Sequence, residues 1–185
     1  MANTANTANH MRQNHTRQNP MQQIRVEKVT LNIGCGDDTA KIEKATKLLQ
    51  LIAEKKPVVT KSKTRSTFGV AKGKPLGAMV TLRKKEAVEL LKRSLVAVEN
   101  KIKKSQFDKD GNFNFGVREY IDILGVRYSH EIGMMGLDVS VTLERPGFHV
   151  KKRRIRQAKI GRKHKINREE AVEWLKNNFG VEIIE

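Results

Sequence analysis

The segment LDVSVTLE (137–144) alternates apolar and polar residues without a break. A period of two is that of a β-strand, so the apolar side chains share one face of a sheet and the polar side chains share the other. The stretch IRVEKVTLNIG (24–34) also alternates, but its phase slips at Glu27-Lys28, as at a β-bulge. Two such strands predict a sheet that buries one face and keeps the other polar.

Three further segments are typical of α-helices. The first follows Asp37-Asp38-Thr39, which offers an N-cap, and its apolar face is Ile42, Ala45, Leu48, Leu49 and Ile52. The second has an apolar face of Val88, Leu91, Leu95, Val98 and Ile102. The third lies near the C-terminus, where Asn167 and Glu170 have capping-box spacing and Gly180 can end the helix.

The elements follow the order strand, helix, strand, strand, helix and further strands. This order predicts an α+β fold in which a single antiparallel or mixed sheet carries helices on one face. We expect one domain at 21–185, including a Gly-rich loop at 64–77 and a basic segment at 145–165. Residues 1–20, rich in Asn, Thr, Ala and Gln, form a low-complexity tail without hydrophobic periodicity.

Composition limits the partners and the compartment. The net charge of +17 and the pI near 10.2 indicate a polyanionic partner, either nucleic acid or an acidic membrane surface. No apolar run approaches the ~18 residues of a membrane span, and the N-terminal tail lacks the apolar core of a secretory signal. Cys35 is the one cysteine, which excludes an internal disulfide and fits a reducing, cytosolic compartment.

The basic charge is clustered, and the first cluster surrounds the Gly-rich loop. No acidic residue lies between residues 55 and 85. On a strand, the cations Lys61, Lys63 and Arg65 would share one face and could contact the phosphates of one RNA strand. Phe68, beside Gly69 at the loop tip, could stack on a base or fold back onto the core.

The second cluster is VKKRRIRQAKIGRKHK (150–165), which includes Lys151, Lys152, Arg153 and Arg154. We interpret it as a phosphate-binding segment, with a solvated basic tail as the alternative. The run lacks the apolar face of an interfacial helix, so a membrane surface is the weaker interpretation. Within it, His164 is predicted to donate to a phosphate.

Motifs that suggest calcium binding, nucleotide binding or catalysis are each incomplete. In DKDGNFNFGVRE (108–119), a calcium-loop pattern has Phe113 where the sharp turn requires glycine, so we expect a turn that leads into a strand. NIGCGDD (32–38) lacks the third glycine of a dinucleotide fingerprint. The histidines have no metal-ligand spacing, and no serine lies in a nucleophile elbow. We predict no metal, no cofactor and no catalytic residues.

Two rivals to an RNA-binding role stay open. A chromatin-type DNA-binding protein would carry similar charge, and duplex DNA should then compete as well as structured RNA. A nucleic-acid-processing enzyme would need clustered acids for a metal, and the candidates Asp37, Asp38, Asp108 and Asp110 lie in predicted turns and caps.

Several motifs resemble one known family, in the same order along the chain. They are RVEKVTLNIGCG (25–36), KPVVTKSKTRSTFGVAKGKPLGAMVTLR (56–83), FDKDGNFNFGVRE (107–119) and GLDVSVTLER (136–145). Over residues 19–185 the sequence is similar to the archaeal form of the family of the fifth protein of the large ribosomal subunit. The N-terminal tail departs from that similarity.

The resemblance implies a non-enzymatic, structural role in the cytoplasmic ribosome. The family's α+β sheet resembles the RNA-recognition (split βαβ) architecture. Its members bind 5S rRNA in the central protuberance, where large-subunit rRNA and other proteins surround them. A loop matching RSTFGVAKGKPLG (65–77) is expected to reach the elbow of the peptidyl-site tRNA. Small-subunit protein thirteen is the expected partner across the subunit interface.

Carried over to this chain, the resemblance implies two sets of contact residues. The open sheet face would offer rRNA the side chains of Asn32, Thr60, Thr81 and Arg83, with backbone contacts from the two basic clusters. The alternative is that these polar residues only form the solvent side of the sheet. The tip of the loop that faces tRNA would consist of Phe68, Gly69, Val70 and Lys72.

Overall fold

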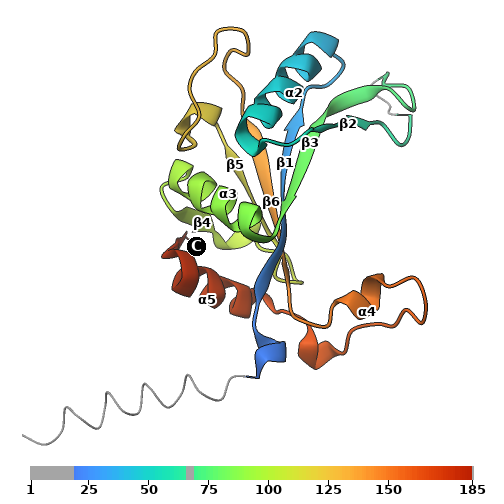
Figure 1. The fold of residues 1–185 in the computed structure, drawn as a ribbon, viewed down its shortest axis with the longest axis vertical. Helices are drawn as coiled ribbons and strands as arrows, with labels where there is room; N and C mark the ends of the chain where they lie inside the picture. The colour runs from blue at the N-terminus through green and yellow to red at the C-terminus, as the bar shows by residue number, and fades with distance from the viewer. Residues whose placement is uncertain (1–18, 66–68, 185) are drawn as a thin grey trace, which may run out of the picture.

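The computed structural model describes residues 19–65 and 69–184. A five-stranded antiparallel sheet runs through the molecule in the order β2-β3-β1-β6-β5 (Figure 1). Its strands are β1 (Arg25–Gly34), β2 (Val58–Lys61), β3 (Pro75–Arg83), β5 (Phe113–Val117) and β6 (Leu137–Glu144). The expected α+β class with an antiparallel sheet is therefore confirmed.

The main helices are α2 (Thr39–Ala53), α3 (Lys84–Ala97) and α5 (Arg168–Phe179), with the single-turn α4 (His149–Lys152). Short 3-10 turns are η1 (Pro20–Gln22), η2 (Lys104–Gln106), η3 (Tyr120–Asp122) and η4 (Arg162–His164). A second sheet pairs β4 (Lys101–Lys103) in parallel with β7 (Glu182–Ile184), which the sequence patterns did not predict. No helix within 19–65 and 69–184 is long and apolar enough to cross a membrane.

Local sequence signals begin α2 and α5 and end α5 as expected. The Asp38 carboxylate accepts hydrogen bonds from the backbone N–H groups of Ala40 (3.0 Å) and Lys41 (3.3 Å), which caps α2. At α5, the Glu170 carboxylate accepts the backbone N–H of Asn167 at 3.0 Å. Gly180 ends that helix with a φ of 64°, a left-handed conformation that glycine adopts without strain.

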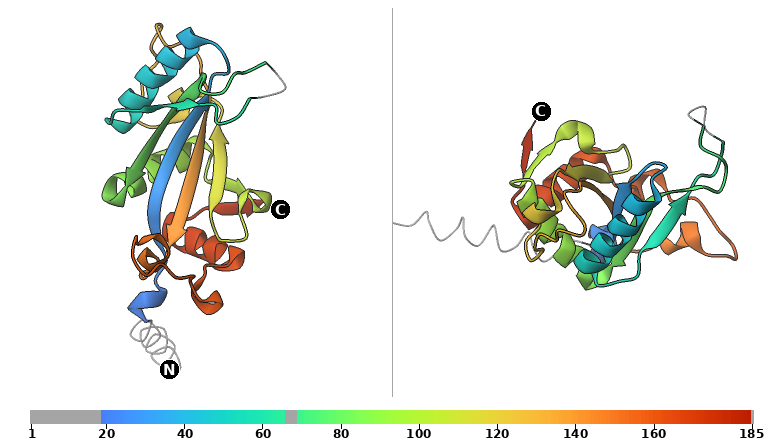
Figure 2. Two further views of the ribbon diagram at one scale, coloured as in Figure 1. Left: turned by 90° about the vertical axis from the view of Figure 1, so that its right-hand side faces the viewer. Right: turned by 90° about the horizontal axis from the view of Figure 1, so that it is seen from above.

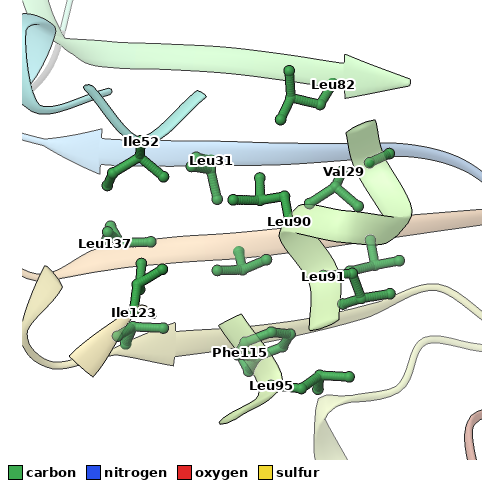
Figure 3. Packing of buried hydrophobic residues seen from close by; sticks show 14 of the residues in the cluster. Val29, Leu31, Ile52, Leu82, Leu90, Leu91, Leu95, Phe115, Ile123 and Leu137 are labelled. Carbon is green, nitrogen blue, oxygen red and sulfur yellow. The ribbon is translucent and has the colours of Figure 1, made fainter. Parts of the chain in front are cut away.

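The core lies between one face of the sheet and the helices α2 and α3 (Figures 2 and 3). Alternate residues of the central strands, such as Leu31 and Val139, are fully buried. Leu90 and Leu91 of α3 pack on the same face. Burial of one such side chain contributes about 1.5–3 kcal/mol, so this face holds the helices on the sheet.

The bulge in β1 was predicted correctly, but the C-terminal end of α3 was not. The bulge is confirmed, since the β1–β6 register shifts between Val26 and Lys28. Helix α3, however, ends at Ala97, so that Val98 lies beyond it and Ile102 belongs to β4. The left-handed backbone at Glu99 and Asn100 stops the helix and turns the chain into that strand.

Candidate nucleic-acid interface

The open face of the sheet consists of the residues that alternate with the buried core positions. In β1 these are Lys28, Thr30 and Asn32, all partly exposed, whereas the intervening Val29 and Leu31 are fully buried. Residues directly opposite each other in an antiparallel sheet lie on the same face. The register therefore identifies which side chains of the neighbouring strands share this face with β1.

Three rows of side chains cross the open face. Asn32 lies between Met79 and Asp138, Thr30 lies between Thr81 and Ser140, and Lys28 lies between Arg83 and Thr142. The hydroxyl oxygens of Thr30 and Thr81 are 3.4 Å apart. The centre of the face is thus made of short hydroxyl and amide side chains, each of which both donates and accepts hydrogen bonds.

All four predicted sheet residues lie on this face. Asn32, Thr81 and Arg83 belong to the three rows, and Thr60 of β2 lies opposite Gly77. The close approach of β1 and β3 depends on that glycine, because a Cβ at Gly77 would lie 2.3 Å from the carbonyl oxygen of Ile33. Thr30, Ser140 and Asn114 also lie on this face and were not predicted. Alternation within a strand gives the face of each residue, but only the register shows that Thr30 and Ser140 form one row with Thr81.

The basic loop differs from its predicted form. Strand β2 ends at Lys61, so Lys63 and Arg65 are not on a strand and do not form the predicted row of three cations on one face. Ser62 closes the base of the loop instead, because its backbone N–H donates to Lys74 O (2.8 Å) and its carbonyl oxygen accepts from Gly73 N (2.9 Å). All three predicted cations are exposed.

The predicted tRNA-contacting tip is only partly described. Phe68 lies outside the described residues. Gly69 has a φ of +82° and is exposed, Val70 is half-buried, and Lys72 is exposed. Figure 1 shows this loop extending from the upper end of the sheet, while the α4 segment extends from the lower end on the same side of the view.

The basic segment is fastened to the sheet by ion pairs. Lys152 contacts the carboxylate of Glu27 and lies 3.6 Å from that of Glu144. Arg83 lies 3.4 Å from Glu27 as well. All four cations Arg83, Lys151, Lys152 and Arg154 are exposed, but only Arg83 and Lys152 are in ion pairs within 19–65 and 69–184. Arg153 donates from Nε to the carbonyl oxygen of Arg156 at 2.7 Å, which holds the turn of the segment.

Glu27 is the acidic centre of this end of the sheet. Its side chain is 11% exposed. Partial burial on its own would raise the pKa of Glu27, but the hydrogen bond and charge of Lys152, with Lys28 and Arg83, lower the pKa below its ordinary value. Glu27 thus stays ionised and links β1 to the basic segment.

His164, which was predicted to donate to a phosphate, makes its observed hydrogen bond within the protein. It is half-buried, its Nε2 is 2.9 Å from the carbonyl oxygen of Pro146, and its ring meets that of Phe148 edge-on with centroids 5.7 Å apart. A carbonyl oxygen can only accept, so Nε2 carries the proton in this contact. The histidine packs the basic segment against the end of β6.

The calcium-like stretch is a turn followed by a strand, as expected. Gly111 N donates to Asp108 O (3.1 Å), Asp108 N donates to Asn112 O (2.7 Å), and β5 begins at Phe113. Asp110 lies 3.4 Å from the Lys165 ammonium group. Within 19–65 and 69–184, no group of three or more His, Cys, Asp or Glu side chains is placed to hold a metal ion.

Comparison with known proteins gives the same result for both parts of the chain. Residues 19–70 match the family Ribosomal protein L5, and residues 75–178 match the C-terminal part of the same ribosomal family. The chain is 50% identical to the large ribosomal subunit protein uL5 of Sulfurisphaera tokodaii, over 90% of this chain and 96% of that protein. It is 47% identical to the uL5 protein of Nanoarchaeum equitans, over 90% and 99% of the two chains. For the uL5 protein of Methanosphaera stadtmanae the identity is 45%, over 89% and 99%.

Proposed function

Because the chain belongs to the ribosomal protein L5 family, here in its archaeal uL5 form, we propose that its open sheet face is the binding surface for 5S rRNA. Membership makes the protein a structural, non-enzymatic constituent of the large subunit, associated with rRNA in the cytoplasmic ribosome. The specific RNA, the tRNA contact and the inter-subunit contact are the proposed part.

One observation carries the proposal for 5S rRNA. The middle row of the open face, Thr81, Thr30 and Ser140, presents three hydroxyl groups on adjacent strands without a large side chain between them. A shallow RNA minor groove displays 2′-hydroxyls and base edges, which hydroxyl and amide side chains can both donate to and accept from. Lys28 adds a cation in the neighbouring row for the backbone.

The basic clusters at the two ends of the sheet would supply phosphate contacts. We propose that Lys61, Lys63 and Arg65 hold the RNA backbone at one end, and that Lys151, Arg153 and Arg154 hold it at the other. Lys152 and Arg83 would support these contacts indirectly, because their ion pairs with Glu27 hold this end of the surface in place. In this proposal residues 21–185 act as a single RNA-binding domain behind the tail at 1–20.

The loop tip is proposed to contact peptidyl-site tRNA. Gly69 and Lys72 are exposed, and both belong to the loop that the hydrogen bonds of Ser62 with Gly73 and Lys74 close. We expect the double variant Phe68→Ala, Lys72→Ala to weaken tRNA retention by reconstituted ribosomes while 5S rRNA binding is unchanged. An equal loss of both activities would remove this division of roles. Contacts with small-subunit protein thirteen and with other central-protuberance proteins are also proposed.

The test of the main proposal is a binding comparison across a salt series. The full chain is titrated with 5S rRNA and with a DNA duplex of equal length. We expect a preference for the RNA that persists at high salt, because shape and hydrogen bonds add to the charge term. Equal affinities that fall together with salt would favour a chromatin-type DNA-binding protein instead.

A further inference from the structure

A cleft of about 690 Å³ lies between the basic segment and the lower end of the sheet. Thr142 and Leu143 of β6 line one side of it, and Lys151 and Ala158 of the basic segment line the other. Thr142 also belongs to the open face, where it lies opposite Lys28. The cleft is therefore continuous with the proposed RNA-binding surface. Figure 1 shows the segment that carries α4 extending from the body of the protein at the lower end of the sheet.

The interior of the cleft is largely apolar. Leu143 and Ile166 are buried in its wall, and Phe148 and Ile160 are half-buried there. The aromatic ring of Phe148 is held by its edge-on contact with His164. Apolar and aromatic walls are the surroundings in which proteins receive bases that have left the helical stack. The volume of the cleft is sufficient for a flat heteroaromatic group, since the volumes of small-molecule sites start at about 300 Å³.

Two amide side chains lining the cleft offer complementary hydrogen-bonding groups. The Oδ1 of Asn112 accepts the Leu143 backbone N–H at 3.3 Å, which leaves its amide N–H groups to donate. The Nε2 of Gln157 donates to the carbonyl oxygen of Lys151, which leaves its Oε1 to accept. One donor and one acceptor beside the apolar wall of the cleft match the edge of a nucleobase, which carries both.

Among the described residues, the charged side chains inside the cleft are paired, whereas those at its rim are not. Lys151, Lys159 and Arg162 are exposed on the lining, and no ion pair to them occurs within 19–65 and 69–184. The acids that also line the cleft, Glu27 and Asp110, are paired with Lys152 and Lys165. Each carboxylate inside the cleft is thus balanced by a cation, whereas the cations at the rim, unpaired in the described part of the chain, attract a phosphate. The arrangement suits a neutral group within and an anion at the rim.

We propose that this cleft receives one unstacked nucleobase of ribosomal RNA, with the flanking phosphates on Lys151, Lys159 and Arg162. The inference rests on the proposed RNA-binding function and adds a site where a single-nucleotide bulge is recognised. RNA fits better than an acidic peptide, because the cleft continues onto the hydroxyl rows of the open face and the chain is a ribosomal protein. Binding of a peptide is an outcome that the test distinguishes.

The test uses the full chain and three RNA hairpins of one sequence. One carries a single bulged 2-aminopurine, one carries an abasic bulge, and one pairs the 2-aminopurine with uridine. We expect the bulged 2-aminopurine hairpin to bind about tenfold more tightly than the abasic one, in line with the effect of stacking one base on protein. Its emission should shift to the blue on binding, because the base leaves water.

Matched variants assign this preference to the cleft. Ala158→Leu adds a larger side chain at the exposed lining of the cleft and should bring the ratio close to one. Ile155→Leu changes a residue of the same segment that is 75% exposed and outside the cleft lining, and it should keep the tenfold ratio. Gln157→Leu, which removes the acceptor, should reduce the ratio without changing the volume of the side chain greatly.

The outcomes separate the cleft from the sheet face. Equal binding of the bulged and abasic hairpins, or a ratio that Ala158→Leu leaves intact, would overturn the cleft proposal even if sheet variants weaken all hairpins. If the sheet variant Thr30→Val, Thr81→Val changes none of the hairpins, the proposed sheet surface fails instead. Displacement of the bulged hairpin by an acidic, tryptophan-containing peptide of equal affinity would assign the cleft to a protein partner and also overturn the proposal.

Discussion

The hydroxyl oxygens of Thr30 and Thr81 face each other across strands β1 and β3 at 3.4 Å, in the centre of the open sheet face. Both side chains are partly exposed, so neither hydroxyl is needed to satisfy a buried group. Each hydroxyl has further hydrogen-bonding capacity beyond this contact. This pair is consequently the most direct place to separate RNA recognition from folding.

We expect the double variant Thr30→Val, Thr81→Val to fold normally and to bind 5S rRNA about tenfold more weakly. Valine keeps the shape and the strand preference of threonine, so stability should change by less than about 1 kcal/mol. Two lost hydrogen bonds of about 0.5–1.5 kcal/mol each give the expected loss of affinity. The measurement is a binding isotherm beside a thermal melt.

The control for this variant is Thr46→Val. The Thr46 hydroxyl donates to the carbonyl oxygen of Ile42 at 2.8 Å on α2, away from the open face. The variant Thr46→Val loses a hydroxyl group outside the proposed interface, so its affinity for RNA should be unchanged. If the sheet variant binds RNA as tightly as the wild type, the hydroxyl rows are not part of the interface.

The basic loop should contribute through charge rather than through base recognition. We expect Lys61→Ala with Lys63→Ala to make the salt dependence of RNA binding shallower by roughly two phosphate contacts. Lys44→Ala with Lys92→Ala removes the same charge from exposed positions of α2 and α3 and serves as the control. A salt slope equal in the two double variants would show that the loop cations do not contact phosphate.

Short-range features of this fold follow from the sequence, and long-range ones do not. The β-bulge after Val26 and the cap at Asp38 depend on neighbouring residues, and both are present as expected. The pairing of β4 with β7 joins two three-residue strands at distant points of the chain, which have too few residues for a periodic signal. The end of β2 at Lys61 likewise depends on its pairing with β3, so the predicted row of three loop cations was wrong.

In the candidate interface, too, short-range features follow from the sequence and long-range contacts do not. The family resemblance implied that Asn32 and Thr81 lie on an open sheet face, and the register places both there. The ion pair between Glu27 and Lys152 joins residues 125 positions apart, so no local pattern predicts it. Lys152, which was expected to contact phosphate, is therefore paired with a strand of the sheet.

The contact between β1 and β3 makes a specific prediction about two facing glycines. A Cβ on Gly77 would lie 2.3 Å from Ile33 O, whereas a Cβ on Gly34, its partner across the strands, would meet nothing within 4 Å. We expect Gly77→Ala to destabilise the protein by about 2–4 kcal/mol, since the backbone of two central strands must move apart. Gly34→Ala should change the free energy of unfolding by less than about 1 kcal/mol. Equal unfolding midpoints in denaturant would contradict the close approach.

The ion pairs of Glu27 predict how stability depends on pH. The pKa of Glu27 is lower in the folded protein than the ordinary value of 4.5, despite partial burial, because Lys152, Lys28 and Arg83 favour the carboxylate. The unfolded chain therefore binds the proton more readily, and the stabilisation is present above about pH 4.5 and is lost as pH falls through the folded-state pKa. Glu27→Gln should lower stability by about 1 kcal/mol near neutral pH, a modest effect because both cations are roughly half exposed.

The check is a series of thermal melts from about pH 7 to about pH 3, where carboxylates titrate. The difference in Tm between the wild type and Glu27→Gln should narrow as the pH falls, because protonation of Glu27 removes the same charge that the variant lacks. Glu43→Gln, at an exposed position of α2, is the matched control and should follow the wild type throughout. A difference that stays constant down to the lowest pH would show that the Glu27 charge does not fasten the basic segment. If the charge does fasten it, Glu27→Gln should also make the basic segment exchange amide hydrogens faster, while the core strands keep their protection.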